Sequence, residues 1–186
     1  MHIGLTSLCL AMASAPLALG QTTPIDNSER AKWLLSENLA PLVLLENVAV
    51  GGVYTLSNSP KEYGPHWDGF GIRVGMVTAE FGVKSVMEAG LGSIWGEDPR
   101  YDRTEGQALP TRLGHVIKMT FLARNRNGEI MPAYSRYLAI PGSSFLSNEW
   151  RPDSEATLGN AAVRTGLGFL TRMGENAWKE FRPRHR

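Results

Sequence analysis

Residues 70–92 read FGIRVGMVTAEFGVKSVMEAGLG, and this stretch decides the fold. Its charged residues follow one another in steps of seven, four and four, which places them on one face of an α-helix: Arg73, Glu80, Lys84 and Glu88. We expect this face to be exposed to water. Pairs one turn apart then add roughly a few tenths of a kcal/mol each.

Small residues crowd the same helix. Gly71, Gly75 and Ala79 recur every four residues on one flank, and the later turns hold Gly82, Ser85, Ala89 and Gly90. Each helical glycine costs up to about 1 kcal/mol relative to alanine, so close packing against another helix must compensate. We expect the last helix to be that partner. Such spacing also drives helix association in membranes, but the charged face argues against a helix surrounded by lipid.

The preceding segment predicts a helix capped by Ser28 and interrupted at Pro41. The apolar pattern resumes from Leu42, so we expect either a kinked helix or two helices joined near Ala40. Residues 39–56 approach the length of a membrane span. They also contain polar and helix-weakening residues, which favour a buried core helix: Pro41, Glu46, Asn47, Gly51, Gly52.

Further helices are expected after this region. One runs from near Pro110 to Ala123, with Leu113, Val116, Ile117, Thr120 and Phe121 inward. Residues 132–149 predict two short helices separated at Pro141-Gly142, and the last helix runs from about Glu155 to Phe181. One short strand is possible at Ile130-Met131. The pattern predicts an all-α fold, a single helical bundle of about five helices with Gly/Ala-rich, closely packed faces.

The N-terminus has the pattern of a secretory signal peptide. An apolar run covers residues 3–19 and ends in Ala18-Leu19-Gly20, which predicts cleavage after Gly20. His2 is the only basic residue before this run, and an N-terminal core helix is the alternative. Cys9 lies inside the run, where it makes a poor lipidation site. We expect a signal peptide over 1–20, a polar lead-in over 21–27, a helical domain over 28–181 and a basic tail over 182–186.

Export places the mature chain in the periplasm or in association with the outer envelope. The only cysteine is lost with the signal peptide, so neither a disulfide nor a thiolate metal site is expected. The chain has 19 basic and 18 acidic residues, a balance that gives no reason to expect a nucleic-acid partner.

The candidates for acid–base chemistry are His66, Asp68, Glu97, Asp98 and His115, because loops between the predicted helices could bring imidazole and carboxylate together. A catalytic role requires at least three of them to share one pocket. Simpler roles compete: His115 bonds within the core, and Asp98 pairs with Arg100 to end a helix and hold the loop. The sequence contains no metal-binding, phosphate-binding or dinucleotide motif, so no metal or cofactor is expected.

The basic tail contains Arg182, Arg184 and Arg186. These side chains suit contact with an anionic membrane surface or another partner. Cations at the end of a helix also interact favourably with its dipole, which is the simpler interpretation.

Gly96-Glu97-Asp98-Pro99-Arg100-Tyr101 is the most specific of several notable segments; the others are 58–64, 69–73, Arg112-Leu113-Gly114-His115 and 147–150 with Pro152-Asp153. Together they resemble a family of small secreted bacterial envelope proteins. The resemblance covers most of the mature chain and implies an envelope location. It implies no activity, cofactor or partner, and the Asp98-Pro99-Arg100-Tyr101 motif is expected to be structural.

The leading hypothesis is a non-enzymatic envelope protein, a structural or interaction module at a membrane surface. Its partner would be another envelope component, the membrane itself or a second copy of the chain. The first alternative is a periplasmic hydrolase-type or metal-dependent enzyme. The second is an integral membrane protein with glycine-packed helices.

Overall fold

The computed structural model describes residues 24–104 and 106–183. The expected signal peptide, Cys9, Arg184 and Arg186 lie outside these residues. In order, the elements are α1 (Asn27–Leu39), α2 (Pro41–Leu56), the short 3-10 helix η1 (Lys61–Tyr63), α3 (Trp67–Trp95), α4 (Leu109–Phe121), β1 (Leu122–Arg124), β2 (Ile130–Pro132), α5 (Tyr134–Leu146), the 3-10 helix η2 (Ser147–Trp150) and α6 (Leu158–Phe181). The described chain therefore confirms the all-α bundle, with six α-helices and one two-stranded sheet.

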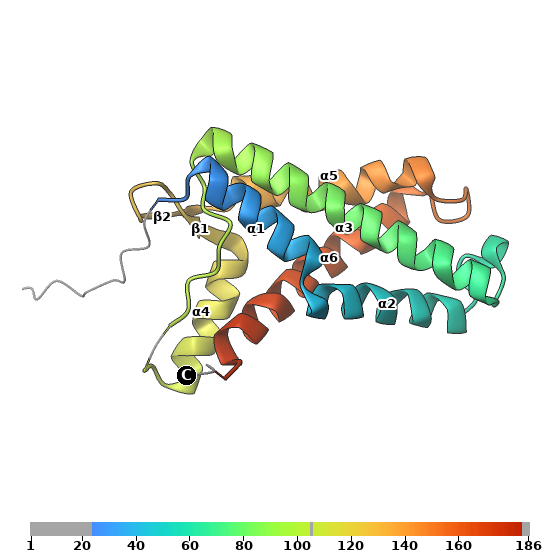
Figure 1. Ribbon diagram of the computed structural model, residues 1–186, viewed down its shortest axis with the longest axis horizontal. Helices are drawn as coiled ribbons and strands as arrows, with labels where there is room; N and C mark the ends of the chain where they lie inside the picture. Colours follow the sequence, from blue (N-terminus) through green and yellow to red (C-terminus); the bar gives the residue numbers. More distant parts are fainter. Residues whose placement is uncertain (1–23, 105, 184–186) are drawn as a thin grey trace, which may run out of the picture.

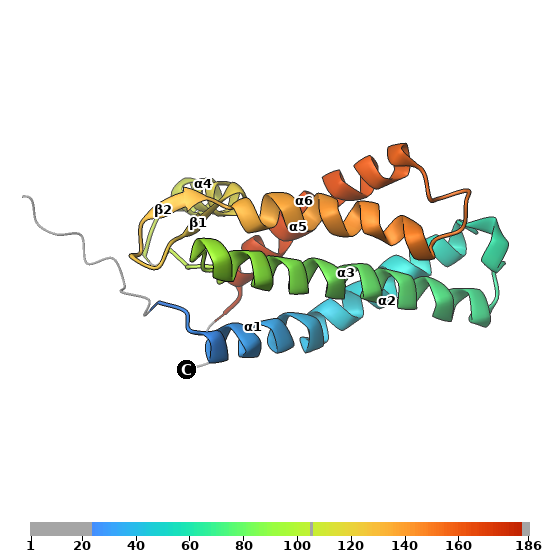
Figure 2. The same ribbon diagram turned by 90° about the horizontal axis from the view of Figure 1, so that it is seen from above.

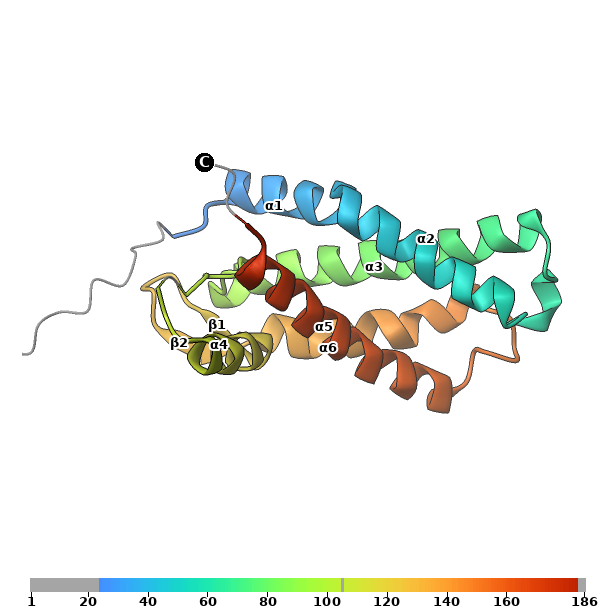
Figure 3. The same cartoon turned by 90° about the horizontal axis from the view of Figure 1, so that it is seen from below.

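The bundle is elongated, and α3 lies along most of its length (Figure 1). Helix α3 packs chiefly against α5 and α2, whereas α6 packs against α5 and α4. Helix α4 lies across one end, together with the strands (Figure 1, Figure 3). We call this the hairpin end; it also holds the start of α1 (Figure 2). The opposite end, formed by residues 57–68 and 147–157, is the loop end.

Helices α1 and α2 are separate, which decides between the two expected arrangements. Asp26, rather than Ser28, caps α1, because its carboxylate accepts a hydrogen bond from the backbone N–H of Glu29 at 2.7 Å. Ala40 is extended, and Pro41 follows as the first residue of α2. The two helix axes differ by 41°.

The charged face of α3 is buried, so the expectation that it meets water was wrong. Arg73, Lys84 and Glu88 are buried, and Glu80 is half-buried. The spacing correctly placed these residues on one face. It did not show that charged side chains from other helices, rather than water, would surround them. The flank with Gly71, Gly75 and Ala79 is exposed instead.

Helix α4 is oriented differently from the prediction. Val116 and Thr120 face inward as expected and are joined by Met119, but Leu113, Ile117 and Phe121 are exposed. With Leu109, these three residues form an apolar stripe at four-residue spacing.

Helix α5 continues through Pro141, so the expected break at Pro141-Gly142 was also wrong. Proline removes one backbone donor from a helix, and here packing of α5 between α3 and α6 maintains the helix. Ser143 and Ser144 are therefore buried within α5 rather than in a connection.

Close packing through glycine is present, but not between the expected helices. A Cβ at Gly51 of α2 would collide with the Val74 side chain of α3, and one at Gly168 of α6 would lie 2.7 Å from Ile140 of α5. Nothing lies within 4 Å of such an atom at Gly71 or Gly75. A Cβ at Gly142 of α5 would likewise lie 2.5 Å from Met87 of α3, so these glycine contacts join α2 to α3, α6 to α5 and α5 to α3.

The expected strand at Ile130-Met131 is confirmed. Strand β2 pairs antiparallel with β1, with Ala123 opposite Met131. Asp98 adds one further backbone bridge to Arg124, which ties the loop after α3 to this sheet.

Candidate functional site

The centre of the bundle contains charged side chains beside buried apolar residues such as Met119 and Ile140. One carboxylate oxygen of Glu88 accepts hydrogen bonds from Arg172 of α6 at 2.9 Å and Arg136 of α5 at 3.2 Å. Arg172 also donates to the carbonyl of Pro99 at 2.9 Å and contacts Glu175 at 3.3 Å. All of these charged side chains are buried. We call Glu88, Arg136, Arg172 and Glu175 the Glu88 cluster.

Lys84 extends this cluster toward α2. Its ammonium lies 3.8 Å from Glu175 and 3.7 Å from the centre of the Phe81 ring. The distance to Glu175 exceeds that of a hydrogen bond, so this buried ammonium is held by a long ion pair and a cation–π contact.

A second ionic group lies nearer the loop end. Glu80 of α3 accepts a hydrogen bond from Arg151 at 2.7 Å, and Arg164 of α6 lies 3.8 Å from the same oxygen. Arg151 also bonds Glu155 at 3.0 Å. We call these four residues the Glu80 cluster.

Arg73 fixes the turn at the loop end. This fully buried guanidinium donates to the backbone carbonyls of Ser59 at 2.8 Å, Pro60 at 2.5 Å and Gly64 at 2.7 Å. Because one side chain satisfies three carbonyls, the role of Arg73 is to hold the connection between α2 and α3.

Glu97 is fully buried at the hairpin end. Its carboxylate accepts hydrogen bonds from the backbone N–H of Ser135 at 2.9 Å and from the Ser135 hydroxyl at 2.7 Å. Burial raises the pKa of Glu97 above its usual value, although the bonds from Ser135 oppose this effect. Its backbone carbonyl accepts a further bond from Arg30 at 2.8 Å. Glu97 therefore joins α1, α5 and the end of α3.

The neighbouring motif residues also make structural contacts. Asp98 pairs with Arg100 at 2.7 Å, as expected from the sequence, and Pro99 accepts the bond from Arg172. The Tyr101 hydroxyl donates to Glu180 of α6 at 3.0 Å. Burial and this bond raise the pKa of Tyr101 well above its usual value.

The five candidates for acid–base chemistry lie at two ends of the molecule. His66 and Asp68 are exposed at the loop end, where α3 begins. Glu97 and Asp98 follow the other end of α3, about 42 Å away for a helix of 29 residues.

His115 lies at the hairpin end but has its own partners. Its Nε2 is 2.7 Å from the carbonyl of Asp102, and its ring lies edge-on to Tyr101. Within residues 24–104 and 106–183, no group of three or more His, Cys, Asp or Glu side chains has an arrangement that could hold a metal ion. His66 and Asp68 thus lie at the opposite end from the other three candidates, and none of the five lines either of the two pockets described below.

The outer surface is unusually apolar for a bundle with so many internal charges. Exposed large apolar side chains occur on every α-helix and include Leu35, Leu45, Leu56, Ile72, Val86, Ile94, Leu113, Ile117, Leu138, Phe145, Val163, Leu167, Leu170 and Trp178. Scattered apolar residues are normal on protein surfaces, whereas large continuous apolar areas mark contact with another molecule or a membrane.

Among the residues that the structure describes, exposed charges are confined to the two ends. No charged side chain is exposed in residues 33–60, 69–95, 130–148 or 154–181, all of which are described. The exposed acidic and basic residues lie near the loop end or the hairpin end and are Asp26, Lys32, Lys61, Glu62, Asp68, Lys118, Arg126, Glu129, Glu149, Asp153 and Arg182. The bundle therefore has polar ends, an apolar girdle and an ionic interior.

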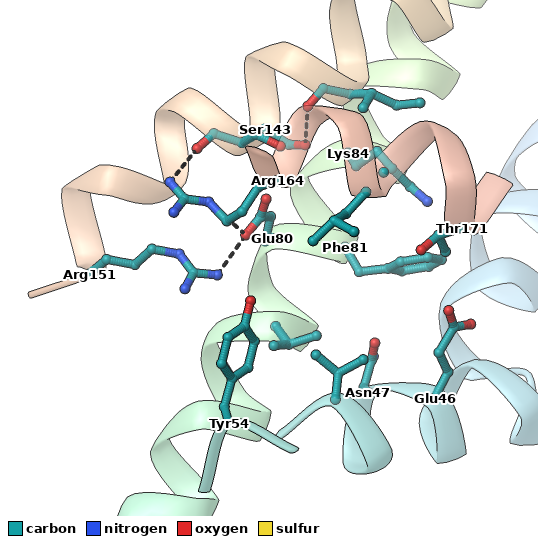
Figure 4. A pocket seen from close by; sticks show the side chains of 16 residues that line it. Glu46, Asn47, Tyr54, Glu80, Phe81, Lys84, Ser143, Arg151, Arg164 and Thr171 are labelled. Atoms are coloured by element: carbon teal, nitrogen blue, oxygen red, sulfur yellow. Dashed lines mark hydrogen bonds and ion pairs between the residues drawn. The ribbon is translucent and has the colours of Figure 1, made fainter. Parts of the chain in front are cut away.

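A cavity of about 240 Å³ lies between α2, α3, α5 and α6. Figure 4 shows Glu46 and Asn47 of α2 across this space from Lys84 and Thr171, with the Glu80 cluster toward the loop end. A second pocket of about 580 Å³ lies at the loop end and shares Tyr54, Arg164 and Leu167 with the first. The two are adjacent and together extend from the loop end into the bundle.

Sequence reasoning did not anticipate this interior. Arg136, Arg151, Arg164 and Arg172 were not singled out, although they provide most of its positive charge. One signal was available: Arg164, Arg172 and Glu175 are separated by eight and three residues, which places them on one face of α6 amid apolar residues.

Hydropathy alone identifies no single membrane-spanning helix among the described residues. Helices α1 and α2 together meet the criteria of length and composition, but as a bent pair. Comparison with known proteins gives no further assignment: no family model, curated protein or solved structure matches this chain.

Proposed function

We propose that this chain is a non-enzymatic integral membrane protein of the bacterial envelope, in which lipid covers the apolar girdle and the charged clusters hold the helices together. The observation that carries the proposal is the absence of exposed charge between the two ends in the described helices. Charged side chains inside membranes characteristically face the bundle interior and pair with one another, as the Glu88 and Glu80 clusters do.

The dimensions of α3 support this proposal. Its first and last residues are Trp67 and Trp95, which are 84% and 41% exposed. A helix of 29 residues separates them by about 42 Å, and a bilayer with its headgroup regions is about 40–45 Å thick. Tryptophan favours these two interfaces.

The inward charges explain why α3 is not recognised by hydropathy. Arg73, Glu80, Lys84 and Glu88 lower its mean hydropathy regardless of the direction they face. Their partners come from other elements of the bundle, so the charges never need to meet lipid. The sequence argument against a lipid environment assumed that this charged face points outward. In the structure it points inward, so that argument no longer applies.

Two further passes reach a comparable length, whereas α5, with 13 residues, is shorter than a membrane span. Helix α6 has 24 residues and extends about 36 Å, while α1 and α2 together form one bent pass. Helix α4 lies across the bundle at the hairpin end and exposes Leu109, Leu113, Ile117 and Phe121 (Figure 1). An apolar stripe of this kind is typical of a helix lying in the membrane interface.

Membrane fractionation tests the proposal. A C-terminally tagged chain is expressed, the membranes are washed with carbonate, and intact mass locates the mature N-terminus. Retention in the washed pellet, resistant to high salt and released by detergent, supports integration. Release by carbonate would instead support the surface-bound envelope module. A mature chain that begins at Gln21 would support export through the expected signal peptide.

A further inference from the structure

We propose that the cavity between α2 and α6 binds an ethanolamine phosphate headgroup, presented by a phospholipid whose tails remain in the bilayer; this rests on the proposed membrane integration. The cavity is bordered by apolar residues, including Val50, Phe81 and Leu167. Helices α2 and α6 diverge toward the loop end, and the cavity lies between them (Figure 1, Figure 3).

Four polar side chains on this cavity make no hydrogen bond to one another, although Glu46 and Lys84 attract each other electrostatically. Within the described chain, the side chains of Glu46, Asn47, Lys84 and Thr171 have no hydrogen-bonding partner in the protein. Lys84 has only its 3.8 Å ion pair and the Phe81 ring. Asn47 and Lys84 are buried, and Glu46 and Thr171 are half-buried, so a ligand that bonds to them would use hydrogen-bonding groups that the protein itself leaves unused.

The charges of the side chains that line the cavity indicate the chemistry of the ligand. Lys84 offers a cation for a phosphate, and Arg164 has a buried Nε with no hydrogen-bonding partner in the structure. Glu46 offers a carboxylate for an ammonium, and Asn47 and Thr171 add neutral donors and acceptors. A headgroup that carries both a phosphate and an ammonium can pair with Lys84 and with Glu46. Choline has no N–H group that could donate a hydrogen bond to Glu46, and a glycerol headgroup has no cation.

The second pocket connects the inner cavity to the surface at the loop end. It is lined by polar residues of the loop end, including Lys61, Glu62 and Asn160, and meets the inner cavity at Tyr54, Arg164 and Leu167. A headgroup entering from the membrane surface would therefore pass Tyr54 before reaching Lys84.

Lipid binding to purified, delipidated protein in detergent tests the inference. Native mass spectrometry compares phosphatidylethanolamine, phosphatidylcholine and phosphatidylglycerol at equal concentration. We expect the ethanolamine lipid to bind about tenfold or more tightly, and Glu46→Gln and Lys84→Met each to remove about that factor, as expected for a charge-assisted hydrogen bond. The matched controls, Glu129→Gln and Lys118→Met, alter exposed residues at the hairpin end and should bind as the unmodified chain does.

Calorimetry with soluble O-phosphoethanolamine distinguishes the sources of the ligand. If the phospholipid binds and O-phosphoethanolamine does not, the lipid tails are required for binding. Binding of the soluble compound, lost in Glu46→Gln, shows that the headgroup suffices and supports the site even if the carbonate wash releases the protein. Thr171→Val gives a further variant with no charge removed, should Lys84→Met fail to fold. Equal binding of all three lipids, or unchanged binding in Glu46→Gln and Thr171→Val, would overturn the inference and leave membrane integration untouched.

Discussion

Glu88 and Arg172 lie 2.9 Å apart in the interior, and the same Glu88 oxygen also accepts a bond from Arg136. One carboxylate therefore connects α3, α5 and α6. Such an arrangement is tolerated in the interior when no partner is missing, because each buried charge is then compensated. Removal of one partner leaves the remaining buried charges uncompensated, which destabilises the fold.

Arg172→Met tests this connection. It leaves Glu88 with one arginine and weakens the pairing of Glu175. We expect a loss of about 3–5 kcal/mol in the free energy of unfolding, the usual effect of breaking a buried ion pair. Denaturant unfolding in detergent measures it. The control, Arg182→Met, alters an exposed arginine and should change stability by less than about 0.5 kcal/mol. Equal effects would show that the Glu88 cluster does not stabilise the fold.

Two adjacent glycines provide a matched test of helix packing. A methyl group at Gly51 would collide with Val74, whereas at Gly52 it would meet nothing within 4 Å. Gly51→Ala should therefore lower the unfolding temperature. Gly52→Ala should raise stability by up to about 1 kcal/mol through helix propensity. If both substitutions change the stability in the same direction, α2 and α3 do not pack as closely as described.

A charge on the girdle distinguishes lipid from water. Val86 is exposed near the middle of α3, and Ile130 is exposed at the hairpin end. In a bilayer, Val86→Lys should cost roughly 2.5–3.5 kcal/mol in insertion, whereas Ile130→Lys should be tolerated. For each variant, the amount of protein recovered in the membrane measures insertion, and denaturant unfolding in detergent measures stability. A Val86→Lys variant that inserts and unfolds like the parent protein would argue for a surface in contact with water.

The buried carboxyl of Glu97 gives a pH-dependent contribution. Its pKa is raised on folding, so the folded state binds more protons than the unfolded state between the two pKa values. This group therefore favours the folded state below its unfolded pKa, and that advantage is lost as pH rises through the folded pKa.

Glu97→Gln removes this titration and retains an oxygen for the Ser135 N–H. We expect the variant to show less destabilisation between acidic and neutral pH than the unmodified protein, measured as the unfolding midpoint at each pH. Parallel pH profiles would contradict a raised pKa at this position.

The sequence predicted the elements better than their surroundings. The spacing from Arg73 to Glu88 correctly placed four charges on one face of a long helix, and the apolar pattern found α6. Helical periodicity, however, identifies a face without identifying what covers it. The partners of the α3 face are Arg136, Arg151, Arg172 and Glu175, all distant in sequence, and no local pattern joins them to Glu88 or Lys84.

Pro141 shows a related limit. Local propensity ends a helix at such a residue, but packing of α5 between α3 and α6 overrides it. The cavity could not be predicted either, because Glu46, Lys84 and Thr171 come from three helices whose relative rotation depends on these contacts.

Spin-label accessibility tests the central claim that lipid covers the girdle. After replacement of Cys9, the only cysteine, single labels are placed by Val86→Cys, Leu170→Cys and Glu129→Cys in the protein reconstituted in vesicles. We expect the labels at positions 86 and 170, on exposed sites of α3 and α6, to be relaxed by oxygen and protected from a water-soluble nickel complex, with the reverse at position 129. If the nickel complex reaches positions 86 and 170 as readily as position 129, the girdle faces water and the account is wrong.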